Sequence, residues 1–386
     1  VRLVGSEMCI RDRDYLAEGR GDLVAANLTV TPTRREQVTF SQPLIAPIEE
    51  WVVSQRELPA FNRITQLSGR RIWVRASSSY FESLHQLNWL FRELGLPPVY
   101  IETVPEYLQD GDLLEMVSAG IIPLTVTDSF KGRIWLDMIG GLKAHRLIPL
   151  RDKGRSAWAL RNNSPELLKA VNAYISESSK RTLYSDMTLR RLLAQSDRMS
   201  NILAPDPLGR LSTIRKVLEA QADKYQLDWL MLAALAYKES GLNPNVGSHR
   251  GAVGIMQLLP STGKEVGIRG ARLTSLEGNV EAACRYMRLI LDTYFNDPGM
   301  DRLNRHLFAL AAYNAGPNRV QALQAKAADK GLDPNVWFGN VEQLVANDVG
   351  QGPINYVGTI YKYYVAYRFS LPQLEGKSEA IEAVQP

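Results

Sequence analysis

The stretch DWLMLAALAYKESGLNPN, residues 228–245, decides the fold of the second half of the chain. Asp228 is a favourable helix N-cap, and the nine residues after it are almost wholly apolar, which predicts a central and buried helix. Gly241 is a typical C-terminal stop. Glu239 is therefore expected in the last turn of a buried helix, near the negative end of the helix dipole.

This position gives Glu239 a predicted chemistry. Burial and the helix dipole both disfavour ionisation, so both raise the pKa of the carboxyl group. A carboxyl group that is still protonated near neutral pH can donate a proton to a leaving glycosidic oxygen. The alternative is a solvated glutamate beside a glycine cap, which is a common way for a helix to end.

Three further motifs follow in order, and the set resembles the lysozyme-like lytic transglycosylase family. ESGLNP (residues 239–244) is similar to its catalytic-acid motif, and GIMQLLPST (254–262) to its substrate-cleft motif. AAYNAGP (311–317) matches the third motif, and INYV (354–357) resembles the fourth, whose tyrosine lines the cleft. The resemblance covers residues 213–369. Gly352-Pro-Ile stands where the family usually has Glu-Thr before the final tyrosine motif.

The resemblance implies Glu239 as the catalytic acid and a set of residues that bind the glycan. That set is Ser240, Gly254, Met256, Gln257, Tyr313, Asn314 and Tyr356. A glycine lets backbone approach a ligand, and Met256 and Gln257 offer an apolar surface and an amide to an acetamido sugar. The alternative for Met256 and Tyr313 is a place in the core, which is common for these residue types.

The reaction is further limited by the acidic residues near this motif set. Glycoside hydrolysis ordinarily uses two carboxylates, but Glu265 is the only acid between Ser240 and Leu276. The family resemblance implies that the substrate completes the reaction. The C6 hydroxyl of N-acetylmuramic acid attacks C1 and forms a 1,6-anhydro ring without water, and one glutamate acts first as acid and then as base. No cofactor and no metal is expected.

The first half of the chain alternates short β-rich runs with helical ones. Strands are expected at residues 23–30, 50–54 and 71–75, and helices at residues 80–95 and 164–177. Such alternation predicts an α/β domain with a mostly parallel sheet.

Two motifs in this half resemble the periplasmic amino-acid-binding protein family. They are GDLVAANLTVTPTR (residues 21–34), followed by VTFSQP (38–43), and AGIIPLTVTD (119–128). The resemblance implies that Thr29 and Arg34 hold a ligand carboxylate and that Asp128 receives the ligand's amino group. Ser78 lies in a Ser-Ser-Ser run that opens a helix after a strand, where amides and hydroxyls suit an anion. The alternatives are that Arg34 is a surface arginine and that Asp128 caps a helix.

These patterns divide the chain into two domains and three other segments. The first domain is expected at residues 14–196, a two-lobed periplasmic-binding-protein-like α/β domain, and an α-rich lysozyme-like domain is expected at residues 213–370. Residues 197–212, rich in Pro, Asp and Gly, are predicted as the linker, and residues 371–386 as a disordered polar tail. Residues 1–13 resemble translated adapter sequence, so we expect them not to belong to the fold and expect any signal peptide or anchor to lie outside this sequence.

Composition restricts the class of protein and its partners. With 45% hydrophobic and 22% charged residues the chain is typical of soluble globular proteins, and it has no apolar run long enough to span a bilayer. The net charge of +4 comes from scattered Lys and Arg residues, which does not favour a nucleic-acid partner. The expected partners are peptidoglycan strands and, in the first domain, a muropeptide or amino acid.

Three functions are compatible with these observations. The first is a lytic transglycosylase with a regulatory ligand-binding domain, which the pair of resemblances places in the periplasm, associated with the outer membrane. The second is a solute receptor whose lysozyme-like half only docks on glycan. The third is a hydrolytic muramidase that uses Glu265 as the second carboxylate. A buried acid at Glu239 favours the first, because a pure binding module does not need one.

Overall fold

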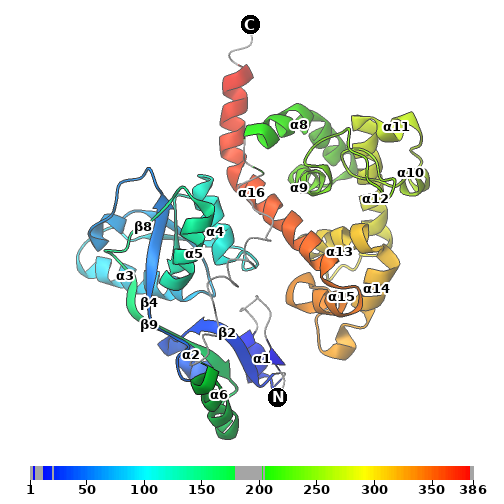
Figure 1. Ribbon diagram of the computed structural model, residues 1–386. Coiled ribbons are helices and arrows are strands. Elements are labelled where there is room, and N and C mark those ends of the chain that lie inside the picture. Colours follow the sequence, from blue (N-terminus) through cyan, green and yellow to red (C-terminus); the bar gives the residue numbers. More distant parts are fainter. Residues whose placement is uncertain (1–2, 5–11, 20, 179–201, 203–204, 383–386) are drawn as a thin grey trace. The chain divides into compact units, whose positions relative to one another are not determined.

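The computed structural model describes residues 3–4, 12–19, 21–178, 202 and 205–382 (Figure 1). The chain forms two compact units, Val1–Arg198 and Met199–Pro386, which are described separately.

The first unit is built on a nine-stranded sheet in the order β1-β2-β9-β4-β7-β5-β6, with β3 beside β9 and β8 beside β4. The strands are β1 Leu3–Val4, β2 Leu23–Thr29, β3 Thr39–Phe40, β4 Ile45–Gln55, β5 Arg71–Arg75, β6 Tyr100–Val104, β7 Leu124–Asp128, β8 Leu142–Ala144 and β9 Arg151–Leu160. The helices are α1 Asp12–Ala17, α2 Pro32–Gln37, α3 Ser79–Glu93, α4 Asp110–Ser118, α5 Ser129–Ile139 and α6 Pro165–Ser178, with a 3-10 turn at Ile64–Leu67.

The sheet is mixed, so the expectation of a mostly parallel sheet was wrong. Among the described strands, only the pairs β1/β2, β5/β6 and β5/β7 are parallel, whereas β4 and β9 run antiparallel to every strand they pair with. The apolar pattern of a strand shows which faces are buried but not the direction of its neighbours, which depends on the connections.

Separate hydrophobic cores show that this unit has two lobes. One core packs Val52, Leu84, Phe91 and Val126, from β4, α3 and β7. The other lobe has two smaller clusters around β2 and β9, one of which includes Val24 and Ala159. β4 and β9 are the long strands that pair with each other and extend between the lobes (Figure 1). The predicted two-lobed α/β fold is confirmed.

The second unit is helical, as expected. Its helices are α8 Pro205–Tyr225, α9 Trp229–Ser240, α10 Pro260–Glu265, α11 Ala271–Thr274, α12 Leu276–Thr293, α13 Arg302–Ala315, α14 Pro317–Ala325, α15 Glu342–Asp348 and α16 Gln351–Glu382. A 3-10 turn, Ala328–Lys330, and a kinked segment, Trp337–Val341, connect α14 to α15.

Helix α9 is the predicted central helix, and both of its predicted ends are confirmed. The Asp228 carboxylate accepts a hydrogen bond from the Leu230 amide (2.9 Å), and Gly241 ends the helix in the left-handed region (φ 61°). The seven residues from Leu230 to Ala236 are all buried. α16 packs along α9, and the Tyr364 hydroxyl on α16 donates to the Asp228 carboxylate (2.9 Å). The N-cap is therefore fixed by a second helix.

Three predicted segment boundaries differ from the structure. Helix α8 begins at Pro205, inside the predicted linker, because Pro is well tolerated in a first helical turn; residues 179–201 and 203–204 lie outside the described residues. The predicted tail is helical as far as Glu382, and its Glu, Leu, Lys and Ala residues favour helix. Within residues 1–13, Leu3–Val4 pair with β2 and two residues belong to α1; a two-residue strand is too short to show periodicity.

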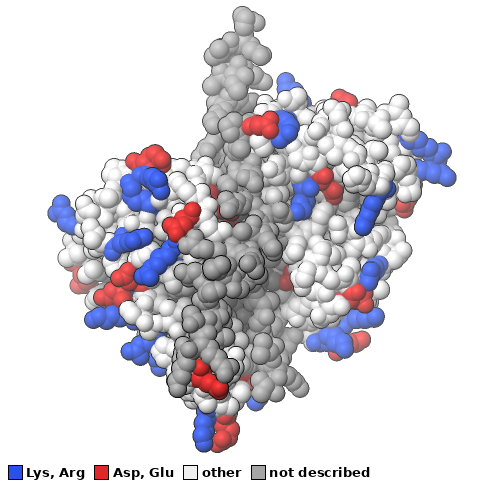
Figure 2. Space-filling view, in the orientation of Figure 1, with Lys and Arg blue, Asp and Glu red and all other residues white. Residues whose placement is uncertain are grey.

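Charge is distributed as the composition suggests. On the face shown in Figure 2, Lys and Arg alternate with Asp and Glu and form no stripe of one sign. In the described part of the chain, no helix combines the length and apolarity needed to cross a bilayer.

Candidate active site

Glu239 lies where the sequence predicts, in the last turn of α9 and partly buried. Burial raises the pKa of its carboxyl group, while a hydrogen bond from Tyr356 and the nearby charge of Lys238 lower it; the net pKa stays above the ordinary value. Within the described part of the chain, no second carboxylate affects this pKa. Glu239 is thus an isolated acid in a partly dry environment, which favours its protonated form.

Tyr356 contacts this carboxyl group directly. Its hydroxyl donates a hydrogen bond to Glu239 Oε1, and its side chain is 8% exposed. Burial, followed by the charge of Glu239, raises the pKa of the Tyr356 hydroxyl well above its usual value, so it remains a donor. The Gly352-Pro-Ile segment that departs from the family motif does not displace Tyr356, because Pro353 lies in the first turn of α16, where proline is tolerated.

The loop that follows α9 is fixed by the buried side chain of Asn279 on α12. Its carbonyl oxygen accepts from the Met256 amide (2.8 Å), and its amide donates to the carbonyls of Val253 (3.0 Å) and Leu273 (2.9 Å). Gly254 has φ 76°, and a Cβ there would lie 2.4 Å from the Asn279 side chain. The close approach to Asn279 is enough to explain the glycine, and the role of Gly254 in glycan binding stays a prediction.

Met256 also differs from its expected role. Its side chain is fully buried, at 0% exposure, and so is not accessible to a glycan. Its backbone carbonyl accepts a hydrogen bond from the Tyr313 hydroxyl (2.8 Å). The core alternative holds for Met256, since its apolar side chain gains more from packing than from exposure, and Tyr313 contributes by holding the loop.

Ser240 and Gln257 complete this loop. The Ser240 hydroxyl is within hydrogen-bond distance of the carbonyls of Ala236 (3.0 Å) and Ile255 (2.8 Å), which links the end of α9 to the loop. The Gln257 amide donates to Val246 (2.9 Å) and Gly254 (2.8 Å), and Gln257 has φ 46°, a conformation that a non-glycine residue rarely adopts. Asn314 is exposed near the end of α13.

Glu265 does not share the environment of Glu239. It is exposed, at the end of α10, and the titrating group that it affects is Tyr286. A second hydrolytic carboxylate would have to lie close enough to Glu239 to act on the same bond, and so to perturb its pKa.

Comparisons with known proteins assign this site to a family. The Transglycosylase SLT domain model matches residues 216–335, and the model of bacterial extracellular solute-binding proteins, family 3, matches residues 12–190. The membrane-bound lytic murein transglycosylase F of Shewanella woodyi (strain ATCC 51908 / MS32) is 31% identical, with 90% of this chain and 73% of that protein covered. The chain belongs to the membrane-bound lytic murein transglycosylase F family.

Other members of the transglycosylase F family match over similar lengths. The protein from Ectopseudomonas mendocina (strain ymp) is 29% identical, covering 93% of this chain and 74% of the relative. Among solved structures, an ancestral arginine-binding protein bound to arginine covers 46% of this chain at 20% identity, with a TM-score of 0.38.

In the first unit of the present chain, Arg34 contacts the opposite lobe. Arg34 is buried, and its guanidinium donates to the carbonyl of Thr29 (2.8 Å) and to that of Ser77 (2.8 Å). Thr29 thus contributes its backbone. Ser78 is the N-cap of α3: its hydroxyl accepts from the Phe81 amide (3.3 Å). Arg34 therefore contacts the backbone of the Ser-Ser-Ser run, and the ligand roles of these residues remain predictions.

Asp128 lies in a buried network of charges that sequence reasoning missed. Its carboxylate pairs with Lys131 (3.1 Å), and its amide donates to the hydroxyl of Tyr80 (3.0 Å). Lys131 also pairs with Asp110 (2.7 Å), as does Arg75 (2.9 Å). Burial alone would raise the pKa of Asp110, but the two cations outweigh it and lower that pKa. An ammonium group of the protein therefore already pairs with Asp128.

Asn279, Tyr364 and Lys131 are the main positioning residues that the motifs did not reveal. Asn279 and Tyr364 contact loop or cap residues 23 and 136 positions away, so local sequence gives no signal for them. Lys131 is only three residues from Asp128, on the next helical turn. Of these three residues, only Lys131 could have been predicted from the sequence, from its i, i+3 spacing to Asp128.

Proposed function

We propose that Glu239 is the single acid–base group of a lytic transglycosylase that cleaves the β-1,4 bond between N-acetylmuramic acid and N-acetylglucosamine. The protonated carboxyl gives its proton to the glycosidic oxygen as the bond from that oxygen to C1 breaks. The C6 hydroxyl of the muramic acid then attacks C1, and its proton returns to the Glu239 carboxylate. The product is a 1,6-anhydro ring; no water is consumed, and the carboxyl ends as it began.

The observation that supports this proposal is the hydrogen bond between Glu239 and Tyr356, with no second carboxylate acting on Glu239 among the residues that the structure describes. A partly buried acid with a raised pKa is suited to the first proton transfer. The Tyr356 hydroxyl stabilises the carboxylate that exists between the two transfers, because it donates to the oxygen on which charge develops. A hydrolase would need a second group to activate water.

The surrounding residues then divide into two roles. Asn279, Ser240 and Tyr313 fix the loop that borders Glu239, which keeps the acid in one position. Gln257 and Asn314 are polar side chains of the motif set that are not fully buried. Ser240 and Tyr313 are also only partly buried, but their hydroxyls hold the loop, so we assign the contacts with acetamido or hydroxyl groups of the glycan to Gln257 and Asn314.

Product analysis tests this mechanism. Purified sacculi are incubated with the full chain, and the released muropeptides are weighed by mass spectrometry. We expect 1,6-anhydro-muramic ends, one water lighter than the products of hydrolysis. Reducing ends as the main product would instead support a muramidase, and binding to sacculi without release would support a receptor with a glycan-docking domain.

For the first unit, we infer a regulatory site for a free muropeptide or amino acid. Arg34 is the candidate for the ligand carboxylate, because it is buried and reaches the backbone that precedes the Ser78 cap. A ligand amine at Asp128 has to replace Lys131 in the ion pair, so we expect the carboxylate to contribute more of the binding.

Titration calorimetry with muropeptides, together with the rate of sacculus lysis, tests this regulatory site. Arg34→Ala is expected to abolish the response to ligand while leaving basal cleavage unchanged. Binding without any change of rate would overturn regulation, and binding that survives Arg34→Ala would overturn the site.

From the resemblance to membrane-bound relatives, we also propose that the protein acts in the periplasm, associated with the outer membrane.

A further inference from the structure

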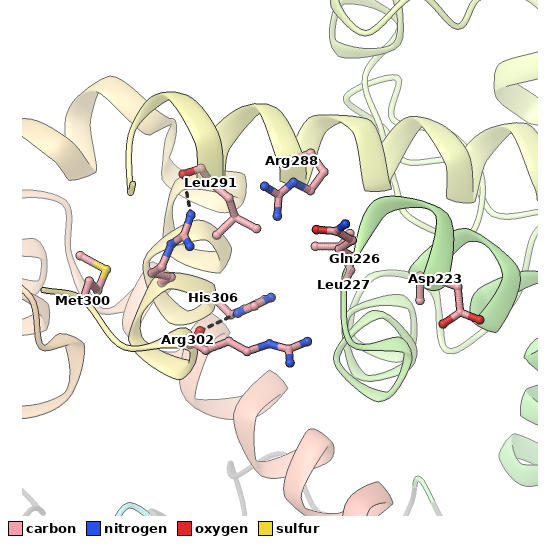
Figure 3. Close-up of a pocket in the computed structure, with 10 residues that line it drawn as sticks. Asp223, Gln226, Leu227, Arg288, Leu291, Met300, Arg302 and His306 are labelled. Atoms are coloured by element: carbon pink, nitrogen blue, oxygen red, sulfur yellow. Dashed lines mark hydrogen bonds between the residues drawn. The ribbon is translucent and has the colours of Figure 1, made fainter. Parts of the chain in front are cut away.

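A cavity lies in the lysozyme-like unit, at the end of α9 opposite to Glu239. It is a cavity of about 570 Å³ lined in part by Leu227, which directly precedes α9. Glu239 is twelve residues further along, so about 18 Å of helix separates the two. Figure 3 shows the side chains of Arg288, Arg302 and His306 around one opening, with Gln226 on the opposite side.

The basic side chains of this cavity are not equivalent. Arg288 pairs with Asp292, and Arg305 donates to the carbonyls of Phe295 (2.8 Å) and Leu291 (3.4 Å). By contrast, the guanidinium of Arg302 has no hydrogen bond or ion pair to any residue that the structure describes, and it lines the cavity. Arg302 is therefore available to bind an anion, and a guanidinium binds a carboxylate through two parallel hydrogen bonds.

His306 adds a different chemistry. Its Nδ1 lies 2.6 Å from the Arg302 carbonyl, which can only accept, so Nδ1 holds the proton and Nε2 is an acceptor. Nε2 is buried and has no hydrogen-bond partner among the described residues. Burial lowers the pKa of His306, which keeps the ring neutral. The cavity thus offers an acceptor that lacks a donor, beside a guanidinium that lacks an anion.

The remaining wall is mixed: Asp223 and Gln226 contribute polar groups, and the rest is apolar. Leu227, Leu291 and Met300 line the cavity with aliphatic and thioether groups. A ligand that satisfies all three features has a carboxylate, an N–H or O–H donor close to it, and a small apolar group. The last residue of a peptide has this arrangement, with its carboxylate, its own amide N–H and its side chain on one carbon.

We propose that this cavity binds the carboxyl-terminal residue of a peptide with a small apolar side chain. The carboxylate pairs with Arg302, the amide N–H donates to His306 Nε2, and the side chain packs on Leu227 and Leu291. If the source is the wall on which Glu239 is proposed to act, the matching ligand is a peptidoglycan stem peptide that ends in alanine, bound about 18 Å from Glu239. That choice of source rests on the proposed function; the peptide chemistry does not.

Ligand-observed NMR on the full chain tests the site. The probes are N-acetyl-D-alanyl-D-alanine, its C-terminal amide and inorganic phosphate. We expect the dipeptide to bind, and both the amide analogue and the variant Arg302→Gln to weaken binding by about tenfold, because a charge-assisted pair is lost. Arg319→Gln is the matched control: that arginine is exposed and pairs with Asp348, and its loss is expected to leave binding unchanged.

Besides a failure of the dipeptide to bind, three outcomes would overturn the inference. They are equal binding of the acid and the amide, unchanged affinity in Arg302→Gln, and phosphate binding as tight as that of the dipeptide, which would reduce the site to a general anion pocket. Sacculus lysis by the same preparation separates this result from the proposed function. Dipeptide binding without lysis supports the peptide site and contradicts the proposed lytic activity. Lysis without dipeptide binding supports the lytic activity and contradicts the peptide site.

Discussion

The two units each bury acidic groups, but they treat these groups in opposite ways. Glu239 accepts a hydrogen bond from a tyrosine hydroxyl and forms no ion pair with any residue that the structure describes, and its pKa is raised even with the charge of Lys238 nearby. Asp110 is paired with both Lys131 and Arg75, and its pKa is lowered. A carboxyl group that must exchange a proton is left without an ion pair, whereas one that must hold a structure together is paired with cations.

The largest effect is expected from removing the catalytic proton of Glu239. Glu239→Gln keeps the shape of the side chain and removes the transferable proton, so cleavage of sacculi should fall by roughly a hundredfold or more. Glycan binding should survive. The rate is followed by release of soluble muropeptides.

Glu265→Gln is the matched control for this variant, because it makes the same change at an exposed position on α10. It is expected to be almost silent. Near-normal turnover in Glu239→Gln would place the acid elsewhere, and a large loss in Glu265→Gln would restore a two-carboxylate hydrolysis.

The next largest effect is expected from removing the charge of Asp110 in the first unit. Asp110→Asn leaves Arg75 and Lys131 without a shared counter-ion, at a carboxylate that is only 10% exposed. Removing one member of a buried pair is expected to lower the free energy of unfolding by about 3 kcal/mol. Because the Asp110 pKa is depressed, this contribution is complete above the usual carboxyl pKa and is lost as the pH falls through the lowered value.

Urea unfolding of the wild type and variant at neutral pH measures this loss. Glu102→Gln is the control, since the pair of Glu102 with Arg71 is exposed, with side chains 37% and 65% accessible, and is worth less than about 1 kcal/mol. If Asp110→Asn costs no more than the control, the network is not structural.

The same contrast explains which features could be predicted from the sequence. The α9 helix, its Asp228 cap and its Gly241 stop follow from local pattern, and Glu239 takes its position from them. The direction of β4 and β9 could not be predicted, because it depends on how distant strands connect. Met256 was assigned to the cleft by its motif, but motif position does not report burial, and the side chain lies in the core.

A smaller effect tests whether loop rigidity matters for the acid. Gly254→Ala places a Cβ against Asn279 and forces an alanine into a φ of 76°, and we expect a loss of about 2 kcal/mol in unfolding free energy with reduced lysis. Gly251→Ala separates the two causes. It has a similar φ of 80° but nothing within 4 Å of the added Cβ, so it retains only the backbone cost. Equal losses in both variants would mean that the Asn279 contact adds nothing.

The smallest effect is expected from removing the hydrogen bond that Tyr356 donates to Glu239. Tyr356→Phe removes the hydroxyl that donates to Glu239, and we expect the rate to fall by about tenfold, because the carboxylate formed between the two proton transfers loses a charge-assisted hydrogen bond. That hydrogen bond lowers the Glu239 pKa, so its loss raises this pKa further. The first step needs the protonated acid, and activity falls as the pH rises through the Glu239 pKa; the alkaline limb of the pH–rate profile should therefore move to higher pH in the variant. Tyr364→Phe removes the same group from the same helix, two turns away at the Asp228 cap, and should leave that limb in place. A shift to lower pH in Tyr356→Phe, or an equal shift in both variants, would show that the hydroxyl does not act on the catalytic proton.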